Sequence, residues 1–263
     1  MSEELVALAS EAARLAGGLL LERSGRGAER EVASKSSPTD LVSEADLAAQ
    51  HAIRELLSAR RPRDGFLGEE GGDEAGESGL RWIVDPLDGT INYLFGIPQW
   101  SVSVAVADGE GVLAGAVYDP NRSELFAASR SGAAVLEGER ELDGRAADPG
   151  QAGEGLATAM VATGFAYDAG VREGQARVLA RLAGEVRDIR RFGSAALDLA
   201  WTAAGRFDAY YERSVKAWDV AAGGLICRRA GLEVRELPEK DGLPWGILVA
   251  PPHLIGELAE LVG

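Results

Sequence analysis

Apolar residues recur at helical spacing in the first sixty positions of the chain. Over residues 3–22, Leu and Ala return every three or four positions with Glu and Arg between them, which predicts an amphipathic helix. A second helix is expected to start after Ser43 and to run to about Arg60, because Pro62 disfavours helical geometry in the residue before it. The stretch from 64 to 77 combines many acidic residues with Gly and is predicted to be a loop.

From Arg81 onwards the pattern changes to the alternation that is typical of β-strands. Turn signals such as Asp108-Gly109 separate the apolar runs. Along residues 100–108, Trp and Val alternate with Ser and Ala, which predicts an antiparallel meander with one face packed on helices. The predicted strands cover residues 81–86, 100–108, 111–120 and 124–130.

The rest of the chain alternates between strands and helices. After a Gly- and Asp-containing region at 143–155, strands are predicted at 158–163 and 207–212. Helices are predicted at 172–184, after Gly193, after Asp219 and from about Pro252. Such alternation is typical of an α/β layer. We therefore expect an α+β or α/β chain in which two subdomains, residues 1–145 and 146–263, pack as one unit.

The composition narrows the classes of function. The 263 residues include 27 Lys and Arg against 42 Asp and Glu, and the formal net charge of −15 argues against a broad nucleic-acid-binding surface. The N-terminal segment has acidic residues where a signal peptide has basic ones, and no apolar run has the length of a membrane span. Together with a single Cys, Cys227, this predicts a cytoplasmic protein. An acidic protein handles anionic substrates when a bound metal ion reverses the local field.

Several common catalytic patterns do not occur in the sequence. The chain has only two His, His51 and His253, and no Ser stands in a Gly-x-Ser-x-Gly setting, so a nucleophilic Ser or Cys assisted by His is not expected. No Gly-x-Gly-x-x-Gly follows a strand and no P-loop is present, which leaves dinucleotide and NTP binding without support. The acidic residues are the informative ones.

Two carboxylates, Asp85 and Asp88, lie three residues apart at the end of an apolar strand. Pro86 and Gly89 force a turn there, and in such a bend both carboxylates and the Leu87 carbonyl can converge on one point. Hard oxygen ligands of this kind suit Mg²⁺. The alternative is that Asp88-Gly89 is only a turn and Asp85 only a strand-end cap.

Three further acids stand at predicted element ends, and each has an ordinary structural explanation. Glu69 follows the apolar pair Phe66-Leu67 and can be a solvated loop charge. Asp46 lies three residues after Ser43, as in a capping box, and Asp219 can be a helix N-cap. Each explanation is sufficient for its own residue, but capping does not explain why all of these acids occur together in this order.

The acidic segments resemble the signatures of the inositol monophosphatase family. Residues 82–90, WIVDPLDGT, are close to its W-[IV]-[IV]-D-P-[IL]-D-G-T signature, and residues 217–223, AWDVAAG, are similar to its second signature, W-D-x-A-A-G. Residues 35–46, 66–70 and 193–212 and the strand WSVSVAV also look like that family in matching order. The similarity covers nearly the whole chain, and the two signatures together are highly specific. Ser43 and Ser194 stand where Thr is common in the family.

The resemblance implies a metal-dependent phosphatase. The residues at its metal-binding positions here are Glu69, Asp85, the Leu87 carbonyl, Asp88 and Asp219, which would hold two or three Mg²⁺ ions around a phosphate monoester. By the same analogy, Thr90 hydrogen-bonds Asp46 and orients the attacking water, and Glu69 belongs with them to the catalytic set. The amides of Gly89 and Thr90 would face phosphate oxygens.

The resemblance also places the alcohol portion of the substrate. It implies that the Gly193-Ser194-Ala195 turn and Glu212 receive the substrate's hydroxyls, although Glu212 can equally be an exposed charge at a strand end. The family's fold is a layered αβαβα sandwich that is usually dimeric, and its esters include inositol 1-phosphate, fructose 1,6-bisphosphate, histidinol phosphate and nucleoside bisphosphates. By this resemblance, inositol 1-phosphate is the expected substrate of the chain. The competing class is a non-catalytic protein that acts with the transcription machinery, as some bacterial relatives do.

Overall fold

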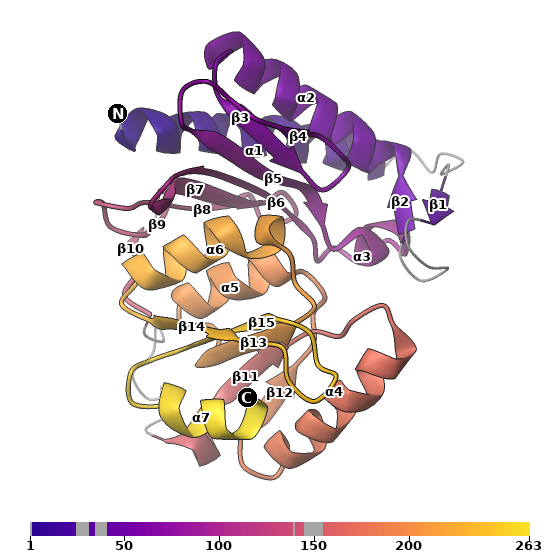
Figure 1. The fold of residues 1–263 in the computed structure, drawn as a ribbon, viewed down its shortest axis with the longest axis vertical. Coiled ribbons are helices and arrows are strands. Elements are labelled where there is room, and N and C mark those ends of the chain that lie inside the picture. Colours follow the sequence, from indigo (N-terminus) through magenta and orange to yellow (C-terminus); the bar gives the residue numbers. More distant parts are fainter. Residues whose placement is uncertain (1, 25–31, 35–40, 139, 145–154) are drawn as a thin grey trace.

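Helices and sheets are stacked in five layers in the computed structural model, which describes residues 2–24, 32–34, 41–138, 140–144 and 155–263. Figure 1 shows α1 and α2 above a large sheet, α5 and α6 between that sheet and a smaller one, and α4 and α7 on the far side of the smaller sheet. The layered α/β class expected from the sequence is confirmed. The predicted subdomain boundary falls largely on residues 145–154, which lie outside the described residues, so the division at residue 145 stays a prediction.

The upper part of the molecule is built around an eight-stranded sheet in the order β10-β9-β8-β7-β6-β5-β3-β4. The predicted helices are present as α1 (Ser2–Ser24) and α2 (Glu44–Arg60), and a two-stranded ladder, β1 (Val32–Ser34) with β2 (Leu41–Ser43), stands apart from the sheet. The strands of the sheet are β3 (Gly65–Gly68), β4 (Asp73–Glu74), β5 (Arg81–Asp88), β6 (Ser101–Asp108), β7 (Gly111–Asp119), β8 (Glu124–Ser129), β9 (Val135–Leu136) and β10 (Arg140–Glu141). The antiparallel meander is confirmed for β5 to β8, while β3 runs parallel to β5.

Two expectations about this sheet are wrong. The stretch 64–77 is not a plain loop, because it contains β3 and β4, which approach so closely that a Cβ on Gly65 would lie 2.7 Å from the Glu74 carbonyl oxygen. Helices also cover both faces of the meander rather than one. The Ser residues of β6 are therefore buried, and the Ser103 hydroxyl donates a 3.1 Å hydrogen bond to the Trp218 carbonyl oxygen.

The lower part is a five-stranded sheet in the order β12-β11-β13-β15-β14. Its strands are β11 (Met160–Thr163), β12 (Asp188–Arg190), β13 (Ala209–Arg213), β14 (Glu233–Leu237) and β15 (Gly246–Ala250), preceded by a 3₁₀ turn at Leu156–Thr158. The helices outside it are α4 (Ala169–Leu182) and α7 (Ile255–Val262). The sequence pattern missed β12, β14 and β15. β12 has only three residues, β14 is largely polar and β15 is apolar throughout, so none of them shows the alternation that identifies a strand.

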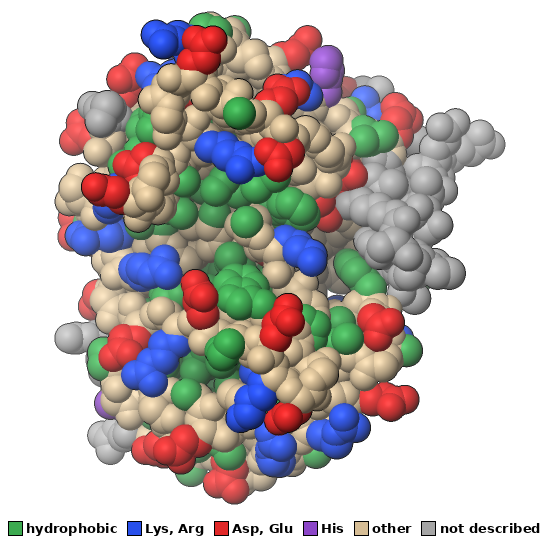
Figure 2. Space-filling view, in the orientation of Figure 1, with side chains coloured by type: hydrophobic (Ala, Val, Ile, Leu, Met, Phe, Trp, Pro, Cys, Tyr) green, Lys and Arg blue, Asp and Glu red, His purple; other side chains and the backbone are tan. Residues whose placement is uncertain are grey.

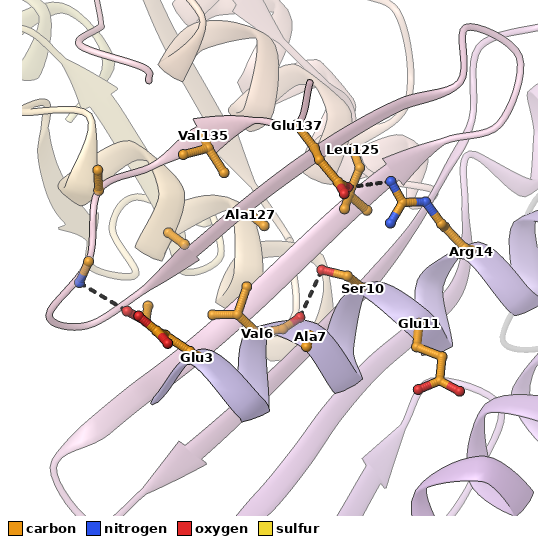
Figure 3. A pocket seen from close by; sticks show the side chains of 14 residues that line it. Glu3, Val6, Ala7, Ser10, Glu11, Arg14, Leu125, Ala127, Val135 and Glu137 are labelled. Atoms are coloured by element: carbon orange, nitrogen blue, oxygen red, sulfur yellow. Dashed lines mark hydrogen bonds and ion pairs between the residues drawn. The ribbon is translucent and has the colours of Figure 1, made fainter. Parts of the chain in front are cut away.

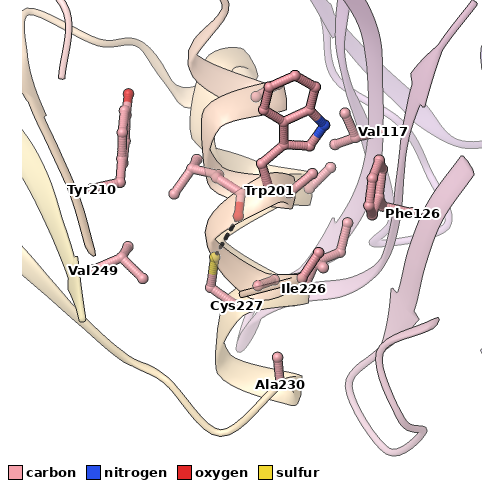
Figure 4. Packing of buried hydrophobic residues seen from close by; sticks show 14 of the residues in the cluster. Val117, Phe126, Trp201, Tyr210, Ile226, Cys227, Ala230 and Val249 are labelled. Atoms are coloured by element: carbon pink, nitrogen blue, oxygen red, sulfur yellow. Dashed lines mark hydrogen bonds between the residues drawn. The ribbon is translucent and has the colours of Figure 1, made fainter. Parts of the chain in front are cut away.

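The central layer consists of α5 (Ala195–Ala203) and α6 (Ala217–Arg229), which are rich in small residues. A Cβ on Gly223 would lie 2.6 Å from the Leu199 side chain, so the two helices touch at this point. Figure 4 shows the resulting core, in which residues of α5 and α6 lie between those of the large sheet and those of the small one. Cys227 belongs to this core, and burial raises the pKa of its thiol to about 12, so it is not a reactive thiol.

On the face drawn in Figure 2, basic side chains are interspersed with acidic ones and do not gather into a band. Among the described residues, the helices are too short or too polar to cross a bilayer.

Candidate functional site

The site is built where β5 leaves the large sheet. The pairing of β5 with β6 shifts register between Asp85, opposite Ser103, and Asp88, opposite Ser101. The extra residue in β5 is a β-bulge. Because residues 101 and 103 point to the same face of β6, the bulge turns the carboxylates at 85 and 88 to one face as well, although three residues separate them. Gly89 follows with φ of 98°, and the chain enters the short helix α3 (Thr90–Leu94).

Four carboxylates from three segments face one another at this point. Burial raises the pKa of Asp85 well above its usual value, and Glu69, Asp88 and Asp219 raise it further. Burial also raises the pKa of Asp88, but hydrogen bonds from the Ser194 hydroxyl and the amides of Ala196 and Ala195 offset the effect, so that it comes to about 6. Acids from β5, from the end of β3 and from α6 therefore share one electrostatic environment.

Asp219 lies in the first turn of α6, two residues inside the helix. The N-cap is Lys216, whose amide donates a 2.6 Å hydrogen bond to Oδ2 of Asp219. The expectation that Asp219 starts the helix as its N-cap is therefore wrong, although its carboxylate does satisfy a free amide of the first turn. Burial, followed by Asp88 and Glu69, raises the pKa of Asp219 well above its usual value, so the capping contact does not account for its position.

Thr90 and Asp46 meet beside the bulge. The Thr90 hydroxyl lies 3.0 Å from Oδ1 of Asp46 and 3.1 Å from the Leu87 carbonyl oxygen, and Asp46 is fully buried. This contact joins the first turn of α2 to the start of α3. The side chain of Ser43, the other half of the capping-box alternative, lies outside the described residues.

The chemistry of the acid cluster fits a hard divalent cation. In the described part of the chain, no group of three His, Cys, Asp or Glu side chains is already arranged around one metal position. The cluster nevertheless supplies only oxygen donors, and Asp85 and Glu69 are close enough to share a hydrogen bond, which requires a proton on one of them. A divalent cation can take the place of that proton and relieve the repulsion among the four acids.

The two predicted turns touch each other across the site. Gly193 has φ of 85° and precedes α5, and a Cβ on Gly89 would lie 3.2 Å from the Gly193 carbonyl oxygen. The Ser194 hydroxyl donates a 2.6 Å hydrogen bond to Oδ2 of Asp88 and lies 3.1 Å from the Ser101 hydroxyl. The structure thus brings Gly193, Ser194 and Ala195 next to the acid cluster.

Glu212 is half-buried inside β13, which ends one residue later, so the alternative of an exposed strand-end charge is wrong. The hydroxyl of Tyr210 donates a 2.9 Å hydrogen bond to Oε2 of Glu212. Burial raises the pKa of Glu212 to about 7; the Tyr210 hydrogen bond and Arg191 lower it, and Asp88 raises it. This carboxyl therefore lies within electrostatic reach of the acid cluster, on its lower side.

Sequence reasoning missed two residues that hold the site together. The Asn92 side-chain amide donates 2.7 Å hydrogen bonds to the carbonyl oxygens of Gln99 and Phe192, which ties α3 to the segment before Gly193. Gln50 of α2 accepts a hydrogen bond from the Glu70 amide and donates one to the Gly71 carbonyl, and so fixes the turn that carries Glu69. Both stand within segments that resemble the family or lie beside them, and nothing in the spacing alone identifies them.

Asp198 is a third residue that sequence reasoning missed. It lies in α5, is 1 % exposed, and neither of its carboxylate oxygens has a hydrogen-bond partner among the described residues. Burial raises its pKa well above the usual value, Glu212 and Asp88 raise it further, and Arg191 lowers it. A single charged residue in a helix of otherwise mostly apolar residues was the available signal.

The pocket in Figure 3 is separate from these acids. It lies between α1 and the strands β8 and β9, and Arg14 of α1 forms an ion pair with Glu137 at its rim. None of the predicted site residues lines it.

Comparisons with known proteins show the family and the fold of the chain. The model of the inositol monophosphatase family matches residues 1–262. The inositol-1-monophosphatase SuhB of Mycobacterium tuberculosis H37Rv is 40% identical over 262 residues, which is 95% of this chain and 89% of the relative, and an inositol-1-monophosphatase of Caulobacter vibrioides is 42% identical over 88% and 89%. The crystal structure of the extragenic suppressor protein suhB of Bartonella henselae superposes with a TM-score of 0.87 at 36% identity, covering 97% of both chains.

Proposed function

We propose that this chain, which belongs to the inositol monophosphatase family and is a phosphomonoesterase, hydrolyses inositol 1-phosphate to inositol and phosphate with Mg²⁺. The observation that carries this proposal is the convergence of Asp85, Asp88, Glu69 and Asp219 beside two glycine-containing turns. An acidic cluster repels a phosphate ester unless cations neutralise it. The family is generally metal-dependent, which fits this requirement.

The ligands that we propose for the metal are the carboxylates of Glu69, Asp85, Asp88 and Asp219 and the carbonyl oxygen of Leu87. Two or three Mg²⁺ ions bound there would lower the pKa of a water molecule and neutralise the charge that develops on the phosphate. Ser194 and the Ala196 amide hold Asp88 in place through hydrogen bonds of 2.6 and 2.7 Å, so this ligand is oriented before the metal binds.

The other residues would act on water and substrate. Thr90 and Asp46 hold the attacking water, and their contact keeps the carboxylate facing the site. Amides of Gly89 and Thr90, at the start of α3, donate to phosphate oxygens. The Gly193-Ser194-Ala195 turn and Glu212 take the hydroxyls of the alcohol. We also propose that the enzyme is dimeric and cytoplasmic and that it consists of two subdomains.

A panel of phosphate esters tests the proposal. The purified protein is assayed for phosphate release from inositol 1-phosphate, fructose 1,6-bisphosphate, histidinol phosphate, 3′-phosphoadenosine 5′-phosphate and p-nitrophenyl phosphate, with Mg²⁺ and with EDTA. We expect the highest kcat/KM for inositol 1-phosphate and no release in EDTA. A higher kcat/KM for another ester would mean that inositol 1-phosphate is not the preferred substrate. Phosphate release in EDTA would mean that the reaction does not need a metal ion.

A second role has one observation in its favour. A relative from Xylella fastidiosa, 41% identical over 232 residues that make up 88% of this chain, is named Nus factor SuhB. We propose an interaction with the transcription machinery as the alternative function. This alternative would be favoured if the protein released no phosphate from any ester of the panel although its acid cluster is intact.

A further inference from the structure

The carboxyl group of Glu212 rests directly on the backbone of Gly164. The strands β11 and β13 are parallel neighbours, and Thr163 pairs with Tyr211, so Gly164 and Glu212 are the next residues along the two strands. A Cβ placed on Gly164 would lie 2.1 Å from Cδ, Oε1 and Oε2 of Glu212. The observed position of this carboxyl is therefore compatible only with Gly at 164.

The backbone at residue 164 does not itself require Gly. Gly89 and Gly193 in the site have φ of 98° and 85°, where other residues are strained, but Gly164 is not among the glycines with positive φ. It is also buried at the end of β11. A side chain at this position would displace the end of the flexible Glu212 side chain and would not strain a backbone turn.

A second contact fixes the same carboxyl from its own strand. Tyr210 lies two residues before Glu212, points to the same face of β13 and is fully buried, and its hydroxyl donates the 2.9 Å hydrogen bond to Oε2. The carboxyl is thus held between the Gly164 backbone on one side and the Tyr210 hydroxyl on another. The charged groups that interact with it electrostatically include Asp88, Asp198, Asp219 and Arg191.

We propose that Gly164 is a specificity-determining residue. By leaving out a side chain, it lets the Glu212 carboxyl sit at the depth where it accepts hydrogen bonds from adjacent hydroxyls of a polyol phosphate. The three atoms nearest to a Cβ at position 164 all belong to Glu212, so Gly164 acts through this side chain. This inference rests on the proposed function, because it assumes that Glu212 receives the alcohol.

The variant Gly164→Ala tests the inference. It should fold, since only a flexible carboxyl has to move, and a melting temperature close to that of the wild type checks this. Polyol esters should lose roughly 5- to 100-fold in kcat/KM, mostly through KM, because a displaced carboxylate leaves substrate hydroxyls poorly paired. The loss for p-nitrophenyl phosphate, which offers no such hydroxyls, should be several-fold smaller. Gly18→Ala is the matched control, because a Cβ at that position in α1 meets no atom within 4 Å apart from the neighbouring backbone of its own helix.

A double-mutant cycle with Glu212→Gln shows whether Gly164 acts through Glu212. We expect the double variant to be no worse on polyol esters than Glu212→Gln alone, since both changes disable the same contact. Free inositol should also inhibit Gly164→Ala less than it inhibits the wild type, whereas inhibition by inorganic phosphate should not differ.

The outcomes separate this inference from the proposed function. If the wild type prefers a polyol ester but Gly164→Ala reduces kcat/KM equally for all esters, or adds its loss to that of Glu212→Gln, the inference is wrong and the proposed function stands. A wild type with equal kcat/KM for polyol esters and p-nitrophenyl phosphate contradicts both, and that result is visible before any variant is made.

Discussion

The hydroxyl of Ser194 donates a 2.6 Å hydrogen bond to Oδ2 of Asp88, a residue 106 positions earlier in the chain. The Ala196 amide donates to the same oxygen over 2.7 Å. The start of α5 is thereby attached to the end of β5, so the acid cluster and the turn proposed for the alcohol form one unit. A substitution that removes this contact is expected to weaken the binding of Mg²⁺ more than it lowers the stability of the fold.

The first prediction concerns Ser194→Ala. Its hydrogen bond lowers the pKa of Asp88, so without it that pKa should rise above about 6 and protons should compete more strongly with Mg²⁺ near neutral pH. We expect the Mg²⁺ concentration for half-maximal activity to rise, and to rise more at pH 6 than at pH 8. Ser194→Thr, which keeps the hydroxyl, should behave like the wild type. Equal Mg²⁺ requirements for the Ala and Thr variants would remove the proposed role of the hydroxyl.

The second prediction separates catalysis from capping at Asp46. Removing a helix cap costs roughly 0.5 to 2 kcal/mol of stability, whereas loss of a proton-accepting group lowers the rate by roughly a hundredfold or more. We expect Asp46→Asn to lower kcat by at least this factor, with only a small change in the melting temperature. Thr90→Ala should show a loss in kcat of the same kind, because it releases the 3.0 Å contact. An intact kcat in Asp46→Asn would favour the cap, because Asn keeps an oxygen that can cap the helix but cannot accept the proton.

The third prediction concerns pH and Asp198, measured in EDTA. A carboxyl whose pKa is raised on folding binds its proton more tightly in the native state, so stability is lost as pH rises from the unfolded value near 4 through the folded value. Asp198→Asn removes one such group and should raise the melting temperature at pH 8 more than at pH 4. Glu239→Gln, an exposed position, is the control and should leave the curve unchanged. Parallel curves for Asp198→Asn and the wild type would mean that Asp198 is not a strained buried acid.

Sequence patterns predicted helices and strands correctly where the buried positions recur with a simple period. Alternation along residues 100–108 predicted β6, and the helical spacing before Arg60 predicted α2. The same alternation suggested one packed face, because small polar residues such as Ser103 look solvent-exposed until a second layer covers them. The strands β14 and β15 lack such a period, because β14 is largely polar and β15 is apolar throughout.

The candidate site divides in a similar way. The order of the acidic segments, with the family resemblance, predicts Asp85, Asp88 and Asp219 from the sequence. Spacing alone did not reveal the bulge that turns Asp85 and Asp88 to one face, since it depends on the register with β6. Gly164 had no signal either, because its role depends on the place where a side chain 48 residues later comes to rest.

The most direct test of the central claim is Mg²⁺-dependent thermal melting of the wild type and of Asp88→Asn. A ligand that binds only the folded state stabilises it by about 2.7 kcal/mol at a hundred times its Kd, so the melting temperature of the wild type should rise steadily with Mg²⁺ concentration. Asn can still accept the hydrogen bonds from Ser194 and Ala196, so Asp88→Asn should melt without metal at or above the wild-type temperature. It should show little rise with Mg²⁺ and at least a hundredfold lower phosphate release. An unchanged Mg²⁺ shift together with full activity in Asp88→Asn would contradict the account.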